Sequence, residues 1–419
     1  MSVLNLSLLY TLAWRNVWRN RRRTMLILLA IAFGIWSMVT LAAMMRGMIE
    51  QQVQNTINNL TGHIQVHAMG YCDDRSIENS MPPPDPTMLK ILRGNNVKAW
   101  STRVRVPAVV ASERESAGVT LVGIDPEGPK GPEGPEGEDG LSFIANSVTE
   151  GQYLQSTADQ GLLLGRKMAE RLETSLGKRV VLMSQDIDND IADRGFRVKG
   201  IFDAKMEATE TGYLFIGRKC AQDMLKLGEN VSELSLVVHD RQDLDAVLQR
   251  LTNAARGLDV QPWTKLEPFL VLAVKMYDAS MLIWFVVVFL AMSFGLVNTL
   301  LMAVFERTRE IGLFQALGMR PKFILAQVLL EALTLLITGL VIGNLLAWAT
   351  IASLGDGLNL SAFAKGLEWA GMSSVIYPLP APSDIITANL LVIVLGIIAS
   401  LYPAWRAARY VPVEAITRT

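Results

Sequence analysis

Residues 280–305 read SMLIWFVVVFLAMSFGLVNTLLMAVF and contain no charged side chain. A helix of about 20 apolar residues crosses the core of a bilayer, so this stretch predicts a transmembrane helix. Three further uncharged stretches of comparable length lie at 24–45, 332–355 and 385–405. Because soluble cores do not use four such stretches in one chain, the sequence predicts a membrane protein with four transmembrane helices.

The first stretch, 24–45, could instead be the apolar region of a signal peptide, since basic residues precede it. The apolar region of a signal peptide has about 7–15 residues, and this stretch is longer. We therefore interpret it as a retained membrane anchor.

Composition separates the chain into two parts. Half of the residues are hydrophobic, and the formal net charge is -1. The segment 47–275 holds 25 basic and 32 acidic residues, whereas the apolar remainder is net basic. An acidic segment joined to a basic, apolar remainder gives no support for nucleic-acid binding.

Basic residues cluster on one side of the predicted spans, and such clusters mark the cytoplasmic side. The charge pattern places both termini in the cytoplasm and two segments, 47–275 and 356–384, outside it. The clusters are Arg15, Arg19, Arg21, Arg22 and Arg23 before the first span; Arg307, Arg309, Arg320 and Lys322 between the second and third; and Arg406, Arg409 and Arg418 after the fourth.

The resulting domain organisation has a large extracytoplasmic domain inserted between the first two spans. The predicted segments are a cytoplasmic amphipathic and basic helix (1–23), span 1 (24–48), the external domain (49–272), span 2 (273–305), a cytoplasmic helix (306–320), span 3 (321–355), an external loop (356–383), span 4 (384–405) and a cytoplasmic tail (406–419).

Strand-like and helix-like patterns alternate through the external segment. HIQVHA (63–68), VRVPAVVAS (104–112) and ELSLVVH (233–239) read as strands, and DLDAVLQRLTNAARG (243–257) reads as a helix. This alternation predicts an α+β domain. The run GPKGPEGPEGEDG (128–140) is too short for collagen and predicts an acidic surface loop.

The external domain holds two kinds of candidate site. Cys72 and Cys220 could form a disulfide in an oxidising periplasm, with two free cysteines as the alternative. His63 and His67 share a strand face near Cys72, but polar strand residues explain them better than a metal site does, so no metal is expected.

The sequence has no GxSxG, HExxH or CxxC motif, and Arg179 follows Gly177-Lys178 where a phosphate-binding loop needs Ser or Thr. We expect no enzymatic activity and no cofactor on this chain.

The segment 305–324, FERTREIGLFQALGMRPKFI, follows the second span. Glu306 and Glu310 lie four residues apart and share a helix face. Gly318 is placed to end the helix, and Pro321 to start the next one. A short charged helix at the membrane surface suits the docking of a cytoplasmic partner; the alternative is an ordinary turn between spans.

ERTREIGLFQALGM within this segment resembles the coupling helix of MacB-type (type VII) ABC transporter permeases, which include Lol-type and FtsX-like members. The tail YPAWRAARYVPVEAIT (402–417), the start AWRNVWRNRRRT (13–24), and GQYL (151–154) with GLLLGRKMAERLETSLGKRV (161–180) are also similar to that family. The resemblance covers essentially the whole chain.

The resemblance implies a dimer of permease chains, homomeric or heteromeric, in the bacterial inner membrane. Two separate cytoplasmic ATPase subunits would bind ATP and Mg²⁺, and movement would pass mechanically to the external domains, where a periplasmic carrier or adaptor could bind. The implied ATPase-coupling residues are Glu306, Arg307, Arg309, Glu310, Gly312, Leu313, Ala316 and Gly318.

Members of the family differ in cargo, and we expect lipoprotein or lipid-like cargo taken from the outer leaflet. The alternatives are peptide or drug efflux, and an FtsX-like chain that moves nothing and activates a periplasmic partner. An ion-coupled secondary transporter would place charges near the middle of its spans, and these spans have none. The expected cargo cavity is lined by Met38, Leu41, Met45 and Met48 with Leu270, Val274, Met281 and Phe285.

Two features of the third span complete the predictions. Gly339 and Gly343 form a GxxxG pattern that permits close helix packing. Glu331 lies near the cytoplasmic start of this span, where a carboxylate serves either a function or a structural hydrogen bond.

Overall fold

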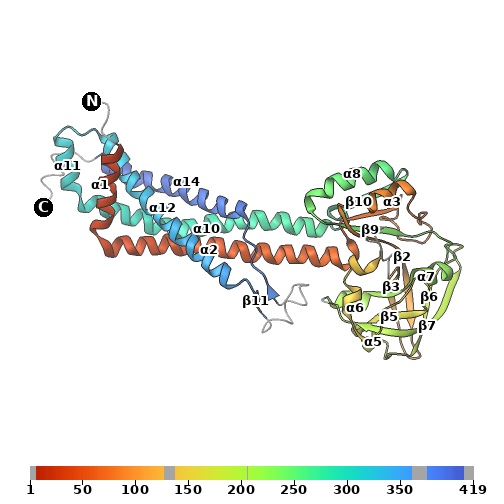
Figure 1. The fold of residues 1–419 in the computed structure, drawn as a ribbon. Helices are drawn as coiled ribbons and strands as arrows, with labels where there is room; N and C mark the ends of the chain where they lie inside the picture. Colours follow the sequence, from red (N-terminus) through yellow and green to blue (C-terminus); the bar gives the residue numbers. More distant parts are fainter. Residues whose placement is uncertain (1–5, 127–136, 205, 361–374, 410–419) are drawn as a thin grey trace. The chain divides into compact units, whose positions relative to one another are not determined.

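The fold was analysed in a computed structural model, which describes residues 6–126, 137–204, 206–360 and 375–409 (Figure 1). The chain forms two compact units: a helical unit of residues 1–50, 273–360 and 375–419, and a second unit of residues 51–272 and 361–374. Residues 127–136 of the predicted acidic loop, the middle of the loop 356–383 and the end of the tail lie outside the described residues. The described end of the acidic run, Glu138–Gly140, is a short 3-10 helix in which Glu138 is buried, so this part is not the surface loop that the sequence predicted.

Four helices are long and apolar enough to cross a membrane, as the sequence predicted. The four long helices are α2 (Arg21–Thr56), α10 (Pro268–Glu306), α12 (Pro321–Ser353) and α14 (Pro382–Ala408). Each of them begins before its uncharged stretch, and three also end after it; α12 ends at Ser353, two residues before its stretch does. The absence of charge therefore does not mark where a helix begins or ends. The shorter elements beside the long helices are α1 (Leu6–Arg19), α11 (Thr308–Ala316) and the paired strands β11 (Leu358–Asn359) and β12 (Val375–Ile376).

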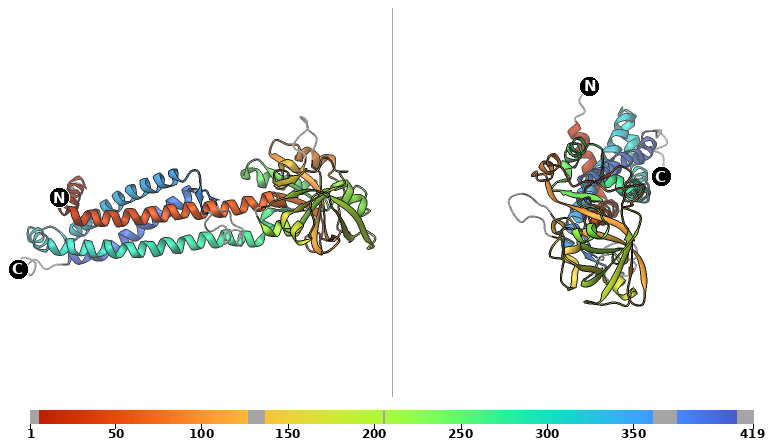
Figure 2. Two further views of the ribbon diagram at one scale, coloured as in Figure 1. Left: turned by 90° about the horizontal axis from the view of Figure 1, so that it is seen from below. Right: turned by 90° about the vertical axis from the view of Figure 1, so that its right-hand side faces the viewer.

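An apolar core in the helical unit is shared by α2, α10, α12 and α14. Figure 2 shows α2 and α10 side by side along their length within this unit. Ile31, Ile35 and Met38 of α2 are completely buried there, with Phe285 and Phe289 of α10. Other apolar side chains of α10, such as Ile283 and Phe294, are exposed, as is expected for a surface that contacts lipid or another chain.

The second unit has the predicted α+β composition. Its strands are β1 (Ile64–Ala68), β2 (Val97–Ala111), β3 (Ser116–Ile124), β4 (Val148–Gly151), β5 (Gly161–Gly165), β6 (Arg179–Gln185), β7 (Ile191–Phe202), β8 (Tyr213–Gly217), β9 (Glu233–Val238) and β10 (Leu258–Pro262). Its longer helices are α3 (Pro86–Leu92), α5 (Arg166–Arg171), α6 (Glu207–Gly212), α7 (Arg218–Met224) and α8 (Leu244–Ala254), and the short ones are α4 (Ile144–Ser147) and α9 (Trp263–Leu266).

Strand β2 belongs to two sheets, which divide this unit into two lobes. Its first half pairs with β9 in the order β10-β1-β9-β2, and α3 and α8 pack with this sheet. Its second half enters a ring in which β2, β3, β8, β5, β7 and β6 each pair with the next, and β6 returns to β2. The second lobe is therefore a closed barrel, which leaves these strands no unpaired edge.

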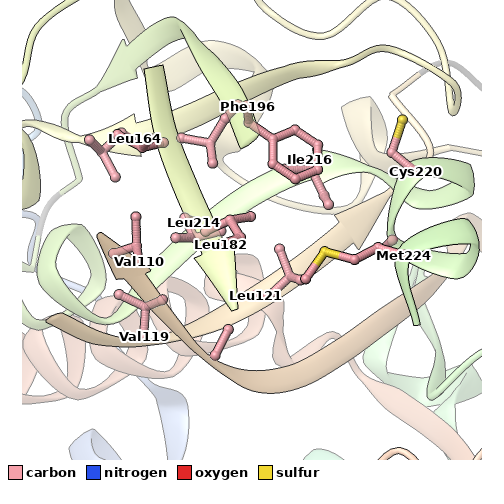
Figure 3. Close-up of a cluster of buried hydrophobic side chains, with 14 of the residues drawn as sticks. Val110, Val119, Leu121, Leu164, Leu182, Phe196, Leu214, Ile216, Cys220 and Met224 are labelled. Carbon is pink, nitrogen blue, oxygen red and sulfur yellow. The ribbon is translucent and has the colours of Figure 1, made fainter. Parts of the chain in front are cut away.

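Alternate residues along the barrel strands fill its interior. Leu121, Leu182 and Leu214 are fully buried, and Figure 3 shows them with Val110 and Ile216 in one cluster. Pro107 in β2 stands opposite Thr120 of β3.

The possible disulfide is not formed: Cys72 and Cys220 are both free, which is the alternative that the sequence left open. The Cys72 sulfur lies 3.7 Å from Nδ1 of His67, whereas the Cys220 thiol donates to the carbonyls of Ala158 and Asp159. The two cysteines belong to different lobes, and spacing along the chain gave no information on that separation.

The two histidines take part in hydrogen bonds within the sheet. His63 Nδ1 accepts from the amide of Val238 at 3.0 Å, and His67 Nε2 lies 3.0 Å from Gln65 Oε1.

Candidate coupling site

Helix α11 is bounded by two residues with non-helical backbone angles, Arg307 before it and Gly318 after it. Arg307 has φ -108° and ψ 13°, which separates α10 from α11, and the Thr308 hydroxyl donates to Phe305 O at 2.8 Å. Gly318 has φ +92°, a conformation that favours glycine. Pro321 then occupies the first turn of α12. The helix is thus shorter than the predicted 306–320.

One side of α11 is packed against the helical unit. Ile311 joins a cluster with Val304, Ile324 and Val328, and with Ala404 and Ala407 of α14. Gly312 is buried. The opposite side is exposed: Leu313 is 53%, Phe314 39% and Leu317 77% accessible. Arg309 is also exposed, as are Ala316 and Gly318. A folded helix therefore presents apolar side chains to its surroundings.

The two glutamates of this segment bind arginines of the same chain. Glu310 accepts two contacts from Arg19 Nη1, at 2.9 and 3.2 Å, and Glu306 lies 3.2 Å from Arg23 Nη1. Sequence reasoning placed both glutamates against a partner, because it could not foresee that the start of the chain returns to this helix.

Arg307 is directed into the helical unit, toward Glu331. Its Nη1 lies 2.8 Å from Glu331 Oε1, and its Nη2 donates to the carbonyl of Asn16 at 2.9 Å. Asn16 also donates to Glu331 Oε1 at 2.6 Å. Glu331 is 6% exposed, so this group of three residues is nearly closed to solvent. It joins α1, the start of α11 and α12 beside a cavity of about 90 Å³.

The two glycines of α12 lie against α2. A Cβ on Gly339 would collide with Ile31 Cγ2, and one on Gly343 would come within 2.7 Å of the Ala32 carbonyl. Real Cβ atoms do not approach so closely, so both positions require glycine.

The residues expected to line a cargo cavity are all described by the structure, which does not gather them around an opening. Met38 and Phe285 are 0% and 2% exposed within the helical core, and Met281 packs against that core. The others are half-buried, except for Leu270, which is buried and belongs to the second unit. The half-buried ones are Leu41, Met45, Met48 and Val274.

Sequence reasoning missed Asn16, Arg19 and Arg23 as partners of the coupling segment. It also missed Arg46, which pairs with Asp384. The only signal available was the position of each charge at the end of an uncharged stretch.

Comparison with known proteins identifies both parts of the chain. Residues 24–254 match the MacB-like periplasmic core domain, and residues 282–412 match the FtsX-like permease C-terminal domain.

Relatives match along nearly the whole chain. LolC of Xylella fastidiosa (strain 9a5c), a lipoprotein-releasing system transmembrane protein, is 22% identical over 407 residues, covering 94% of this chain and 93% of LolC. The pyoverdine export ATP-binding/permease protein PvdT of Pseudomonas syringae pv. tomato is 27% identical over 428 residues, covering 97% of this chain and 58% of PvdT. The chain therefore spans little more than half of PvdT.

Among solved structures, the periplasmic region of MacB from Actinobacillus actinomycetemcomitans aligns with 52% of this chain and 97% of its own, at 11% identity and a TM-score of 0.35. The MacB-like match covers more than half of the chain, and the FtsX-like match follows it without overlap. The chain belongs to the MacB-type family of ABC transporter permeases, with an extracytoplasmic MacB-like core domain and an FtsX-like permease domain.

Proposed function

We propose that this chain is the membrane subunit of an ATP-driven complex in which a separate cytoplasmic ATPase docks on α11 and the transported cargo is a lipoprotein or a lipid-like molecule. The observation that supports the cargo most directly is the alignment with LolC, which runs over almost the full length of both chains. The chain would act in the bacterial inner membrane with both termini cytoplasmic.

The exposed side of α11 supports the docking proposal. Leu313, Phe314 and Leu317 present an apolar surface with Arg309 beside it. The apolar side chains would enter a groove of the ATPase, and Glu306 and Glu310 would pass its movement to Arg23 and Arg19. Two ATPase subunits would serve two permease chains, and ATP and Mg²⁺ would bind to the ATPase.

Docking can be tested by co-purification. Leu313→Glu should abolish retention of the ATPase on a tagged permease, since it places a charge in the middle of the apolar surface. Leu176→Glu is the matched control, because it makes the same change on the external domain at a side chain that is 45% exposed. Equal retention by the wild type and both variants would contradict docking through α11.

Cargo is tested on the assembled complex in mild detergent, by mass spectrometry of co-purifying lipids and lipoproteins. Met45→Glu places a charge at the end of α2 that leads into the periplasmic domain. Met302→Glu is the matched control, because it places the same charge on α10 near the end that leads into α11. Acylated lipoprotein enriched with the wild type and the control but lost with Met45→Glu supports the proposal.

Peptide or drug efflux is the second candidate, because the relatives named as pyoverdine export proteins have the higher identity, 27% against 22%. An FtsX-like role as activator of a periplasmic partner is the third. Absence of acylated species, together with ATPase activity stimulated by a soluble compound or by a periplasmic protein, would replace lipoprotein transport by one of these.

A further inference from the structure

Arg46 joins the three helices α2, α10 and α14 at one end of the helical unit. Its Nε and Nη2 donate to the two carboxylate oxygens of Asp384, in the first turn of α14, at 2.5 and 2.8 Å. Its Nη2 also lies 3.4 Å from Asp278 Oδ1 of α10. A two-pronged contact of this kind fixes the orientation of both groups as well as their separation.

The surroundings of Arg46 reinforce the same junction. Its guanidinium lies 5.3 Å from the centre of the Tyr277 ring, an attractive arrangement of a cation over an aromatic face. The Tyr277 hydroxyl donates to the carbonyl of Ala42 at 3.1 Å, and the amide of Leu379 donates to the carbonyl of Ala43 at 2.9 Å. These contacts hold α2 to α10 and to the segment that precedes α14.

The cost of this arrangement argues for a specific role. The side chains of Arg46 and Asp384 are 29% and 16% exposed, so both charges have lost much of their hydration. Arg46 directly follows the uncharged stretch of α2. Apolar side chains would hold three helix ends together without this desolvation, whereas an ion pair can be released and formed again.

The junction stands beside the surface expected to receive cargo. Met38 lies two helical turns before Arg46 in α2, roughly 12 Å away along the helix, and Phe285 lies the same distance beyond Tyr277 in α10. Both side chains are packed in the core, at 0% and 2% exposure. In this structure α2 and α10 are therefore closed against each other next to the junction.

We propose that Arg46 is a positioning residue for transport: its pairing with Asp384 keeps α14 closed against α2, with Met38 covered in the core that these helices share, and release of that pair uncovers Met38. Asp278, whose side chain is 63% exposed, offers a second acceptor, so the guanidinium remains paired while α14 separates from α2. The role in transport rests on the proposed function, whereas the closure itself does not.

The test measures how fast a thiol at position 38 reacts. The full chain carries Met38→Cys with Cys72→Ser and Cys220→Ala, and it is reconstituted in lipid nanodiscs with neither ATPase nor cargo. Adding Arg46→Ala should raise the rate of labelling by a water-soluble maleimide about tenfold or more, because it leaves Asp384 without its charge partner. Arg46→Lys should give an intermediate rate, since lysine keeps the charge and loses the two-pronged contact.

Two controls separate closure from general stability. Leu336→Cys reports on α12, since Leu336 is 1% exposed and the side-chain contacts of Arg46 described above all go to α10 and α14. Its labelling should not change with Arg46→Ala. The exchanged pair Arg46→Asp with Asp384→Arg should label more slowly than Arg46→Ala, because it restores an ion pair.

Unchanged labelling of the thiol at position 38 in Arg46→Ala would overturn the proposal, as would an equal increase at position 336 or an exchanged pair as fast as Arg46→Ala. The cargo experiment is interpreted separately. Faster labelling in Arg46→Ala without any co-purifying acylated cargo supports the closure by Arg46 and rejects lipoprotein transport. Unchanged labelling together with co-purifying acylated cargo rejects the closure and leaves lipoprotein transport supported.

Discussion

Replacement of Glu331 by Gln tests whether the buried contacts of Arg307, rather than the exposed ion pairs, hold α11 on the helical unit. The side chains of Arg307 and Glu331 are 14% and 8% exposed, and those of Arg19 and Glu310 are 52% and 51% exposed. Glu331→Gln keeps the size of the side chain and leaves the Arg307 charge without a counter-charge.

The expected cost follows from this difference in burial. Removing one partner of a buried pair costs about 3–5 kcal/mol, and Arg307 retains the Asn16 carbonyl, so we expect about 2–4 kcal/mol for Glu331→Gln. Exposed pairs contribute about 0–1 kcal/mol, which sets the expectation for Glu310→Gln. With about 1.36 kcal/mol per factor of ten, opening of α11 becomes about 30- to 900-fold more frequent in the first variant and at most about fivefold in the second.

Hydrogen exchange of the α11 amides, measured on the full chain in nanodiscs, reports these openings directly. Glu310→Gln is the matched control, since it makes the same chemical change one helix away. Exchange accelerated equally by the two variants, or less than about fivefold by Glu331→Gln, would refute the assignment of stability to the buried group.

Three further predictions concern both units. Arg103 is fully buried between Glu138 (2.7 Å) and Glu233 (3.0 Å), so Arg103→Met should destabilise the external domain by about 3–5 kcal/mol in denaturant titrations, with the exposed Arg114→Ala within about 1 kcal/mol as control. Burial, with Arg241 and Lys98 nearby, lowers the pKa of His63 to about 4 from 6.5, so the unfolded state binds the extra proton between these values. Stability of this domain should therefore fall as the pH drops from 6.5 to 4, and a thermal-melting series that His63→Gln fails to flatten would contradict that cause. Gly343→Ala should lower the melting temperature, because its Cβ would clash with the Ala32 carbonyl. Gly295→Ala is the control: its Cβ meets nothing within 4 Å, so the melting temperature should rise or stay unchanged. A change of the same sign in both variants would count against close packing of α12 on α2 at Gly343.

Sequence patterns predicted what depends on local composition. The four membrane helices, the α+β external domain and the break at Gly318 follow from uncharged stretches, alternation and a single glycine. Helix ends were predicted less well, since α2 starts at Arg21 and continues to Thr56. The polar residues at either end of the uncharged stretch carry no signal that separates helix from loop.

Contacts between distant segments could not be predicted. Arg19 and Glu310 are separated by 291 residues, and Arg103 and Glu233 by 130. A charged residue in the sequence indicates that it needs a partner but not which residue that partner is. Each of these arginines could have paired with any of several acidic residues. For the same reason the state of the two cysteines stayed open: the sequence shows that a disulfide is possible, and only the folded lobes show that Cys72 and Cys220 lie apart.

The pairing of β1 with β9 and β10 has a consequence for biosynthesis. Residues 64–68 of β1 pair with residues 233–236 of β9 and 258–262 of β10. The first strand of the external domain therefore cannot pair until its last two strands have been synthesised. Contacts of such long sequence separation form slowly, because the loop between them must be closed first. Nearly 200 residues must therefore leave the translocon before this lobe can close. Until then the first half of β2, residues 97–103, lacks its partner β9 and remains an unpaired edge that chaperones and proteases can reach.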